Sequence, residues 1–190
     1  MGRIYALIVQ RVTKGIGPEF EEVERTLSKT FLPTLFGDDY ADDGPRRKLS
    51  CLPVKWTGLA IPDPTSSADS NYEASFLLCS HLLAALQGVE PFRSADHMSV
   101  ISEVKAELKL RNNAKYEAAM IPLTSKLSCD NRRTILRGQE TGQWLSVLPS
   151  TVNGTELSAQ EFRDTLLLRY GRCPADLPAS CDGCNQKFSV

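Results

Sequence analysis

Residues 70–88 read SNYEASFLLCSHLLAALQG, and this stretch decides the fold class. Its apolar residues are spread around most of the circumference of a helix, which favours a helix covered on several sides. Ser70 and Glu73 have the spacing of a capping box, and Gly88 supplies the left-handed stop that often ends a helix. We therefore predict a buried central helix from about Ser70 to Gln87.

Helical patterns continue on the C-terminal side of this stretch. Residues 95 to about 120 alternate apolar and charged positions, as in an amphipathic surface helix, with a break expected at Asn112 and Asn113. A further helix is expected from Lys126 to Arg137. Residues 144–148 are short and apolar, which predicts a buried extended stretch or a single turn.

The last predicted helix has the clearest local boundaries. Ser158 and Glu161 form a capping box at its start, and Gly171 ends it. At the other end of the chain, residues 4–12 are apolar without a starting cap, and a second helix is expected to begin at Gly17 and Pro18. Pro33 is expected to kink or end that second helix.

Residues 37–64 contain too many prolines, glycines and aspartates for a long regular element, so we predict an exposed loop that contains the basic run Arg46, Arg47 and Lys48. A short strand or extended segment is possible between Leu49 and Ile61. The fold class expected from these patterns is mainly α, an irregular helical bundle of about five or six helices with little or no sheet. The expected segments are residues 1–36, a loop at 37–68, a helical core at 69–172 and a cysteine-containing tail at 173–190.

Composition narrows the class of protein. The chain has 190 residues, of which 42% are hydrophobic, and its 22 basic and 23 acidic side chains give a net charge of -1. This balance lacks the overall basic excess of an autonomous nucleic-acid-binding protein, so any such binding must be local. The longest apolar stretch near the start is too short to span a membrane, and no signal-peptide pattern follows it, which predicts an intracellular protein of cytoplasm or nucleus.

Cys181 and Cys184 are the strongest chemical signal, because two thiolates separated by two residues can chelate one metal through a tight turn. Tetrahedral zinc needs four ligands, and no second pair follows in this sequence. We therefore expect half of a zinc knuckle, and we interpret the chain as a piece of a longer protein. Zinc is expected in the intact parent protein, and no cofactor is expected in this chain.

A second candidate site is basic. Arg132, Arg133, Arg137 and the nearby Lys126 could face the phosphates of a nucleic acid from one side of a helix, since positions 133 and 137 are one turn apart. The alternative is an ordinary solvated helix face, because acidic residues nearby partly neutralise the patch.

A third pattern, Tyr40-Ala41-Asp42-Asp43, matches the paired carboxylates that hold two magnesium ions in reverse transcriptases. That chemistry needs a rigid hairpin between apolar strands, whereas glycine, proline and arginine surround this segment. We interpret it as a solvated acidic loop. His81 and His97 are interpreted as structural, and Cys79 and Cys129 as small core residues.

Several longer runs resemble one family, the region downstream of the polymerase domain in reverse-transcriptase-like proteins of non-LTR retroelements. The matching runs are spread from residue 59 to residue 184 and are residues 59–64, 92–97, 141–150, 153–158, 161–164, 168–171, 176–178 and 181–184. In that family the two cysteines open a C-x2-C-x7-H-x4-C knuckle, of which only Cys181 and Cys184 are matched here. The resemblance implies a helical connector between the polymerase thumb and the knuckle.

The function expected from these observations is therefore non-catalytic. The chain would help to position RNA or DNA through phosphate contacts beside the polymerase and nuclease-like domains of a parent protein, without a membrane. One alternative is a protein–protein or intramolecular packing module with no affinity for nucleic acid. The other is a polymerase fragment that uses Asp42 and Asp43.

Overall fold

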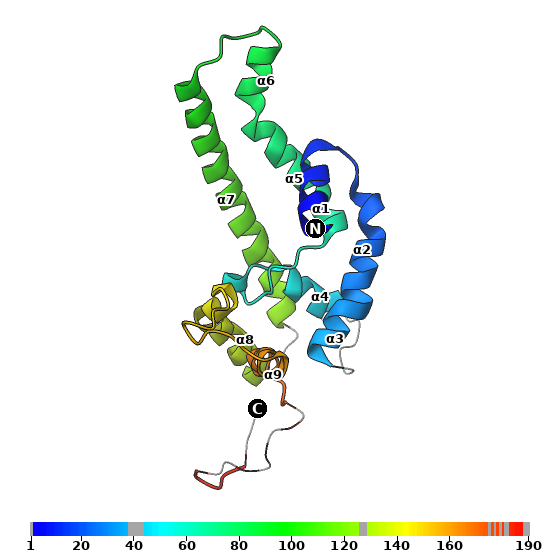
Figure 1. Cartoon of the computed structure of the whole chain (residues 1–190), viewed down its shortest axis with the longest axis vertical. Coiled ribbons are helices and arrows are strands. Elements are labelled where there is room, and N and C mark those ends of the chain that lie inside the picture. Colours follow the sequence, from blue (N-terminus) through cyan, green and yellow to red (C-terminus); the bar gives the residue numbers. More distant parts are fainter. Residues whose placement is uncertain are drawn as a thin grey trace. The chain divides into compact units, whose positions relative to one another are not determined.

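The computed structural model describes residues 2–37, 44–125, 129–174, 176, 178, 180 and 183–187. The fold is mainly α, as predicted, and the only β-type pairing among these residues is an isolated antiparallel bridge between Ser180 and Lys187 (Figure 1). The helices are α1 (Gly2–Val12), α2 (Glu21–Thr26), α3 (Leu32–Phe36), α4 (Gly44–Cys51), α5 (Pro64–Leu78), α6 (Ser80–Leu86), α7 (Ser94–Ser125), α8 (Cys129–Thr141) and α9 (Ala159–Arg169). Shorter turns are η1 (Gly17–Phe20), η2 (Leu27–Phe31), η3 (Val54–Trp56) and η4 (Gly142–Ser146).

These elements form two compact units, each built from two separate stretches of the chain. Unit 1 comprises Met1–Leu27 and Pro62–Ala119, and unit 2 comprises Ser28–Ile61 and Met120–Val190.

Unit 1 is organised around the first half of α5, which packs against α1, η1 and α2. The contact with η1 is close, since a Cβ atom on Gly17 would lie 2.7 Å from the carbonyl oxygen of Thr65. The contact with α1 is polar. The buried Gln10 side chain donates to the carbonyl of Pro64 at 2.8 Å and accepts from the Asn71 side chain at 2.9 Å.

The start of α5 lies six residues before the predicted start. Asp63 caps the helix, because its carboxylate accepts from the backbone N–H groups of Thr65 and Ser66. Burial alone would raise the pKa of Asp63, but these hydrogen bonds and one from the Thr65 hydroxyl outweigh it and hold that pKa below its ordinary value. The predicted capping box at Ser70 is wrong because Asp63, followed by Pro64, already provides a complete helix start.

The prediction of a buried central helix is also wrong. The helix breaks at Cys79 into α5 and α6, and Phe76, Leu77 and Leu82 are exposed. The hydrogen bonds between α5 and α1 involve Pro64 and Asn71 in the N-terminal half of α5, whereas Phe76 and Leu77 near its C-terminus are exposed. Helix α7 runs through Asn112 and Asn113 without the expected break, while Gly88 does adopt the predicted left-handed conformation.

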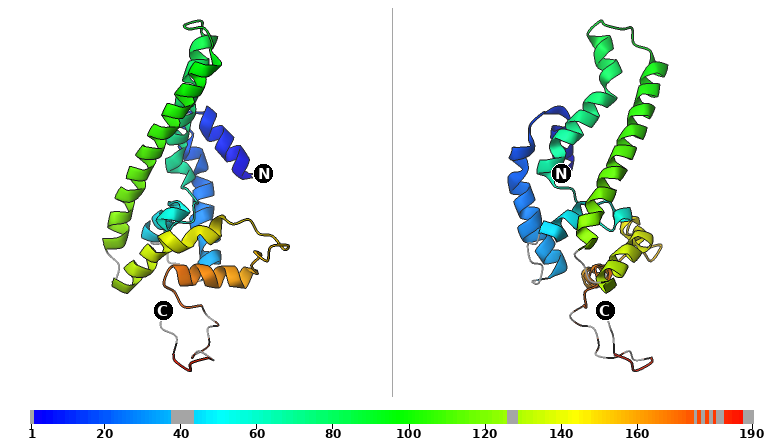
Figure 2. Two further views of the ribbon diagram at one scale, coloured as in Figure 1. Left: turned by 90° about the vertical axis from the view of Figure 1, so that its left-hand side faces the viewer. Right: turned by 180° about the vertical axis from the view of Figure 1, so that it is seen from behind.

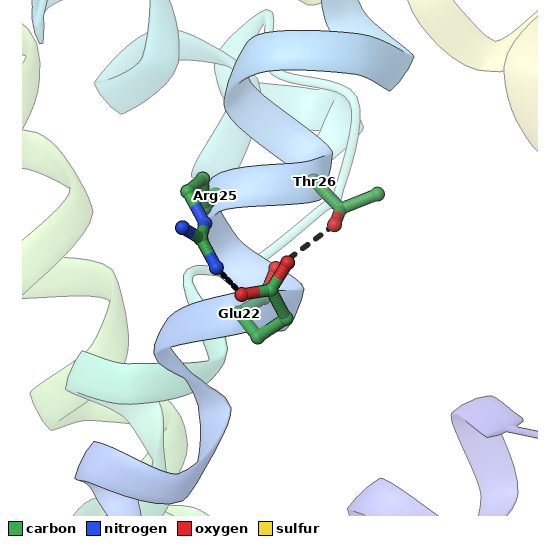
Figure 3. Close-up of polar contacts among 3 residues, drawn as sticks. All are labelled: Glu22, Arg25 and Thr26. Atoms are coloured by element: carbon green, nitrogen blue, oxygen red, sulfur yellow. Dashed lines mark hydrogen bonds and ion pairs between the residues drawn. The ribbon is translucent and has the colours of Figure 1, made fainter.

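Exposed polar contacts link residues of helix α2 to one another (Figure 3). Arg25 forms an ion pair with Glu22, and the Thr26 hydroxyl donates to the Glu22 backbone carbonyl at 2.9 Å. Exposed pairs of this kind contribute little, about 0–1 kcal/mol. The position of α2 within unit 1 therefore depends on its packing against α5.

Unit 2 contains the main apolar core. Leu32 and Phe36 of α3 and Leu166 of α9 form its buried centre, and Trp144 and Phe162 pack around them with their rings edge to face. Ser158 and Glu161 form the predicted capping box, in which the backbone N–H of Ser158 lowers the pKa of Glu161. Residues 142–146 form the single turn that was one of the two predictions for this segment, but Val147 and Leu148 are exposed.

The predicted loop at 37–68 is wrong for α4, η3 and the start of α5. Within it, Arg47 is buried in α4 and donates to the carbonyl of Ile61 at 2.8 Å, so the basic run at 46–48 is not a uniformly solvated loop. No strand forms between Leu49 and Ile61. The interruption expected at Pro33 is confirmed, because η2 is a widened π turn and Pro33 lies in the first turn of α3.

Candidate nucleic-acid interface

Helix α8 presents its arginines on one side. Arg132, Arg133 and Arg137 are exposed, whereas Ile135 and Gly138 are buried. At 3.6 residues per turn, the three arginines fall within an arc of about 140°, and the buried residues face the opposite direction. Leu136, which is partly exposed, lies between the arginines.

The outward face of α8 is electrostatically favourable for an anion, although modestly so. Unit 2 has thirteen basic residues against eleven acidic ones, a net charge of +2, whereas unit 1 has nine against twelve, a net charge of -3. Of the two units, the one that contains α8 is therefore the one with a net positive charge. Arg133 also takes part in a contact within the chain.

The inner face of α8 is fixed by a buried cation. Arg169 is only 8% exposed, and its guanidinium lies against Gly138 in the last turn of α8 and Gly142 at the start of η4. A Cβ atom on Gly142 would collide with the guanidinium nitrogens. Only a residue without a side chain permits this approach at position 142, and the glycine therefore sets how closely α9 packs on α8.

The charge of Arg169 has few direct partners among the described residues. Its Nη2 donates to the carbonyl of Val54 at 3.0 Å, while Nε and Nη1 have no hydrogen-bond acceptor. Arg169 is the last residue of α9 and lies beside the last turn of α8, so the negative ends of two helix dipoles meet at the guanidinium. This position lowers the free-energy cost of burying the charge of Arg169.

A second contact from α9 holds η3 in place. The Tyr170 hydroxyl donates to the carbonyl of Thr57 at 2.8 Å, and Thr57 has a left-handed backbone with φ of 68°. Through Arg169 and Tyr170, η3, α8 and α9 form one packed support behind the arginine face. Sequence reasoning missed this support, although glycines four apart on a helix are a recognisable sign of close approach.

Other predicted site residues lie outside the described residues or stand alone. Lys126 lies outside, as do Tyr40, Ala41, Asp42 and Asp43, so neither the fourth phosphate contact nor the polymerase alternative is tested. Cys181 also lies outside, while Cys184 is exposed in the turn spanned by the Ser180–Lys187 bridge. In the described part of the chain, no three His, Cys, Asp or Glu side chains are grouped so that they could hold a metal ion.

The two histidines meet, which the sequence did not predict. The rings of His81 and His97 stack with centroids 6.1 Å apart, and the Phe92 ring lies within 6 Å of both. The structural role expected of both stays a prediction. Cys79 and Cys129, by contrast, are exposed free thiols, so their assignment to the core is wrong.

Within the described ranges, no helix combines the length and the apolar character needed to cross a bilayer. No family model, curated protein or solved structure matches the chain. The resemblance to reverse-transcriptase-like retroelement proteins therefore stays a prediction that rests on the sequence motifs.

Proposed function

We propose that this chain is a non-catalytic connector of a reverse-transcriptase-like retroelement protein, and that the outward face of α8 contacts the phosphates of RNA or DNA. The observation that carries the proposal is the placement of Arg132, Arg133 and Arg137 on one exposed arc, opposite the buried face of the same helix. Lys126, which precedes α8 in the sequence, would extend the row of contacts.

The mode of binding follows from the chemistry of the guanidinium group. Arginine presents a planar set of donors that matches two phosphate oxygens at once, and its charge is retained at any physiological pH. Phosphate contacts position a nucleic acid without reading its sequence. Helix α8 packs on η3 and α9, so the backbone positions of its three arginines are fixed before binding, which lowers the entropy lost on binding.

In this proposal the chain performs no chemistry of its own. Cys181 and Cys184 would contribute two thiolates to a zinc site, and the other two ligands of a tetrahedral site would come from elsewhere in the parent protein. Polymerisation and strand cleavage would likewise belong to other domains.

The salt dependence of binding tests the proposal. Fluorescence anisotropy with labelled single-stranded RNA and DNA of about 20 nucleotides would be measured from roughly 50 to 200 mM salt. Three phosphate contacts predict a slope of log K against log salt of about -2, so affinity should fall roughly 20-fold over that range. The variant R132Q/R133Q/R137Q should bring the slope close to zero, because glutamine keeps the helix propensity and removes the charge.

The matched control is Arg163→Gln, which removes an exposed arginine from α9 and should leave the slope unchanged. Circular dichroism would show that each variant keeps its helix content. A wild-type slope indistinguishable from zero, or a triple variant that binds as well as the wild type, would contradict the proposal.

A further inference from the structure

Unit 1 exposes a group of apolar side chains where α6 turns into α7. Figures 1 and 2 show these two helices side by side and joined by a short connection. Five residues of this region are between 39% and 77% exposed, and we call them the tip patch: Leu82, Leu86, Val89, Phe92 and Met98. Scattered exposed apolar residues are ordinary, but a group at one end of a hairpin marks an interaction surface.

The backbone beneath the tip patch is well defined. Gly88 has a left-handed φ of 72°, its N–H donates to the carbonyl of Ala85 at 3.1 Å, and the Val89 N–H donates to that of Ala84 at 3.0 Å. This pattern is the Schellman motif, which ends α6 with its last carbonyls satisfied. The exposed side chains are therefore displayed by an ordered turn.

The stacked histidines fix which way α6 and α7 face each other. His81 of α6 and His97 of α7 point inward, and the Arg93 backbone N–H donates to His81 Nε2 at 3.4 Å. Each following residue is turned by about 100°, and because the helices run in opposite directions these turns lead to the same side of the hairpin. Leu82 and Met98 thus share one face, and Leu86 lies one turn beyond Leu82.

Two lysines and two glutamates of α7 lie on opposite sides of the helix. On a helical projection, Lys105 and Lys109 fall within about 20° of Met98, whereas Glu103 and Glu107 fall on the opposite side. All four charged residues are exposed. The face that carries the apolar tip is therefore basic two to three turns further along α7.

This sorting places like charges four residues apart on both sides of α7, at Glu103 with Glu107 and at Lys105 with Lys109. Such like-charge pairs destabilise an isolated helix by about 0.2–0.5 kcal/mol each, so neither pair stabilises α7. They do produce one face that is complementary to an acidic, partly apolar ligand.

A membrane surface fits this face less well than a protein does. Segments that bind anionic lipids carry clusters of about four to eight basic residues, whereas this face presents Lys105 and Lys109. The tip patch also lacks the tryptophan and tyrosine residues that anchor proteins at the lipid interface.

We propose that this face of the α6–α7 hairpin binds an acidic amphipathic helix of a partner protein. Apolar side chains of that helix would cover Leu82, Leu86 and Met98, and its carboxylates would meet Lys105 and Lys109. Positions 105 and 109 lie about 10 and 16 Å along α7 from Met98, which sets the spacing between the apolar and acidic parts of the partner. The inference is independent of the phosphate contacts assigned to α8 in unit 2.

Two designed helical peptides of the same composition test this inference on the full chain. In one, leucines occupy one end of a single face and glutamates lie two to three turns away on that face. In the other, the same leucines and glutamates are dispersed around the helix. Anisotropy of the labelled peptides should show at least about tenfold tighter binding of the first, because only its groups match the tip patch and the lysines together.

Variants separate the two parts of the surface. Leu86→Ser with Met98→Ser, and Lys105→Gln with Lys109→Gln, should each weaken binding by about tenfold, and all four positions are exposed so the fold is retained. The matched control, Glu103→Gln with Glu107→Gln, changes the opposite side of α7 and should leave affinity within about twofold.

Three outcomes would overturn the proposal. The first is equal affinity for the two peptides, and the second is binding that the Leu86→Ser/Met98→Ser variant does not weaken. The third is a different occupant. Binding to phosphatidylglycerol vesicles, or dimerisation of the chain in sedimentation, would assign the face to lipid or to a second copy if the same variant abolished it.

Discussion

The two units bury their interiors in different ways. Among the described residues, unit 2 contains nearly all of the buried apolar side chains, including Leu32, Leu52 and Leu166. Unit 1 buries only Ala68 of this class, together with the polar Gln10. Unit 2 is thus stabilised mainly by apolar burial, whereas unit 1 is stabilised by close helix contacts and by hydrogen bonds whose donors and acceptors are matched.

The two kinds of interior should respond differently to substitution. An apolar core tolerates small shifts, but a buried polar contact fails as soon as one partner is lost, because the other is left without water or a hydrogen bond. Unit 1 also exposes more of its apolar side chains at the α6–α7 end. Four substitutions test the contrast, in order of decreasing effect.

Leu166→Ala should have the largest effect. Leu166 is fully buried at the centre of unit 2, and its truncation leaves a cavity between α3 and α9. We expect a loss of about 2–5 kcal/mol in the free energy of unfolding, measured by urea denaturation. Leu168→Ala removes the same atoms from the same helix at a position that is 47% exposed, and it should cost less than about 1 kcal/mol. Equal losses for the two variants would contradict the assigned core.

Gly142→Ala should be the next largest. The added methyl group would collide with the Arg169 guanidinium, so we expect a loss of about 1–3 kcal/mol in urea denaturation. Gly138→Ala is the graded control and should cost less, because its Cβ would meet Arg169 at ordinary distances and only the Thr57 methyl group more tightly, at 3.3 Å. In a double-mutant cycle, Arg169→Met should remove part of the cost of Gly142→Ala. Additive effects would show that the two residues do not touch.

Gln10→Ala tests the polar contact of unit 1. The substitution leaves the carbonyl of Pro64 and the side chain of Asn71 without their partner, and we expect a loss of about 1–2 kcal/mol. Amide hydrogen exchange would show whether protection falls in α1 and α5 first. Thr26→Ala, which removes one exposed hydrogen bond from α2, should change protection there by little. Protection lost equally in unit 2 would contradict separate stabilisation.

Asp63→Ala should have the smallest effect, and a pH-dependent one. The folded pKa of Asp63 lies below its ordinary value of 3.8, so its contribution is complete above that pH and is lost as pH falls further. We expect a loss of about 1 kcal/mol at pH 7 and a smaller loss at about pH 3. Asp63→Asn keeps an N-cap acceptor without a charge and should lose less at neutral pH. A loss independent of pH would contradict the assigned cap.

Local signals in the sequence were sufficient for some helix boundaries. The capping box at Ser158 and Glu161 and the left-handed glycines at positions 88 and 171 are all present, because each depends only on residues within one turn. The same kind of signal at Asp63 and Pro64 was misread as the end of a loop. Asp63 with Pro64 and Ser70 with Glu73 are both acceptable helix N-termini, and the sequence alone did not show which of them is used.

Burial could not be predicted from composition. The apolar run around Phe76 and Leu77 has the composition of a buried helix, but both residues are exposed. Whether another element covers such a run depends on where distant segments pack. Arg47 shows the reverse error, since a basic residue in a proline-rich segment is buried by a hydrogen bond to Ile61, fourteen residues away. Both errors concern long-range packing, and the periodicity of apolar residues gives no information about it.

In the candidate site, too, local features could be predicted and long-range contacts could not. The common exposure of Arg132, Arg133 and Arg137 follows from helical periodicity and was predicted. The support from Arg169 was not, because residues 138 and 169 are separated by thirty-one positions in the sequence. The approach of His81 to His97 was missed for the same reason.

Helix α9 has a consequence for how the molecule reaches its native state. Its start and its stop are both encoded within its own sequence, so it needs no distant contact to define its length. It also carries Leu166, around which the apolar centre of unit 2 assembles. A segment that is both locally specified and central is well suited to form early in the transition state, with φ-values above those of α6 and α7. Folding of unit 2 would then begin near its C-terminal helix.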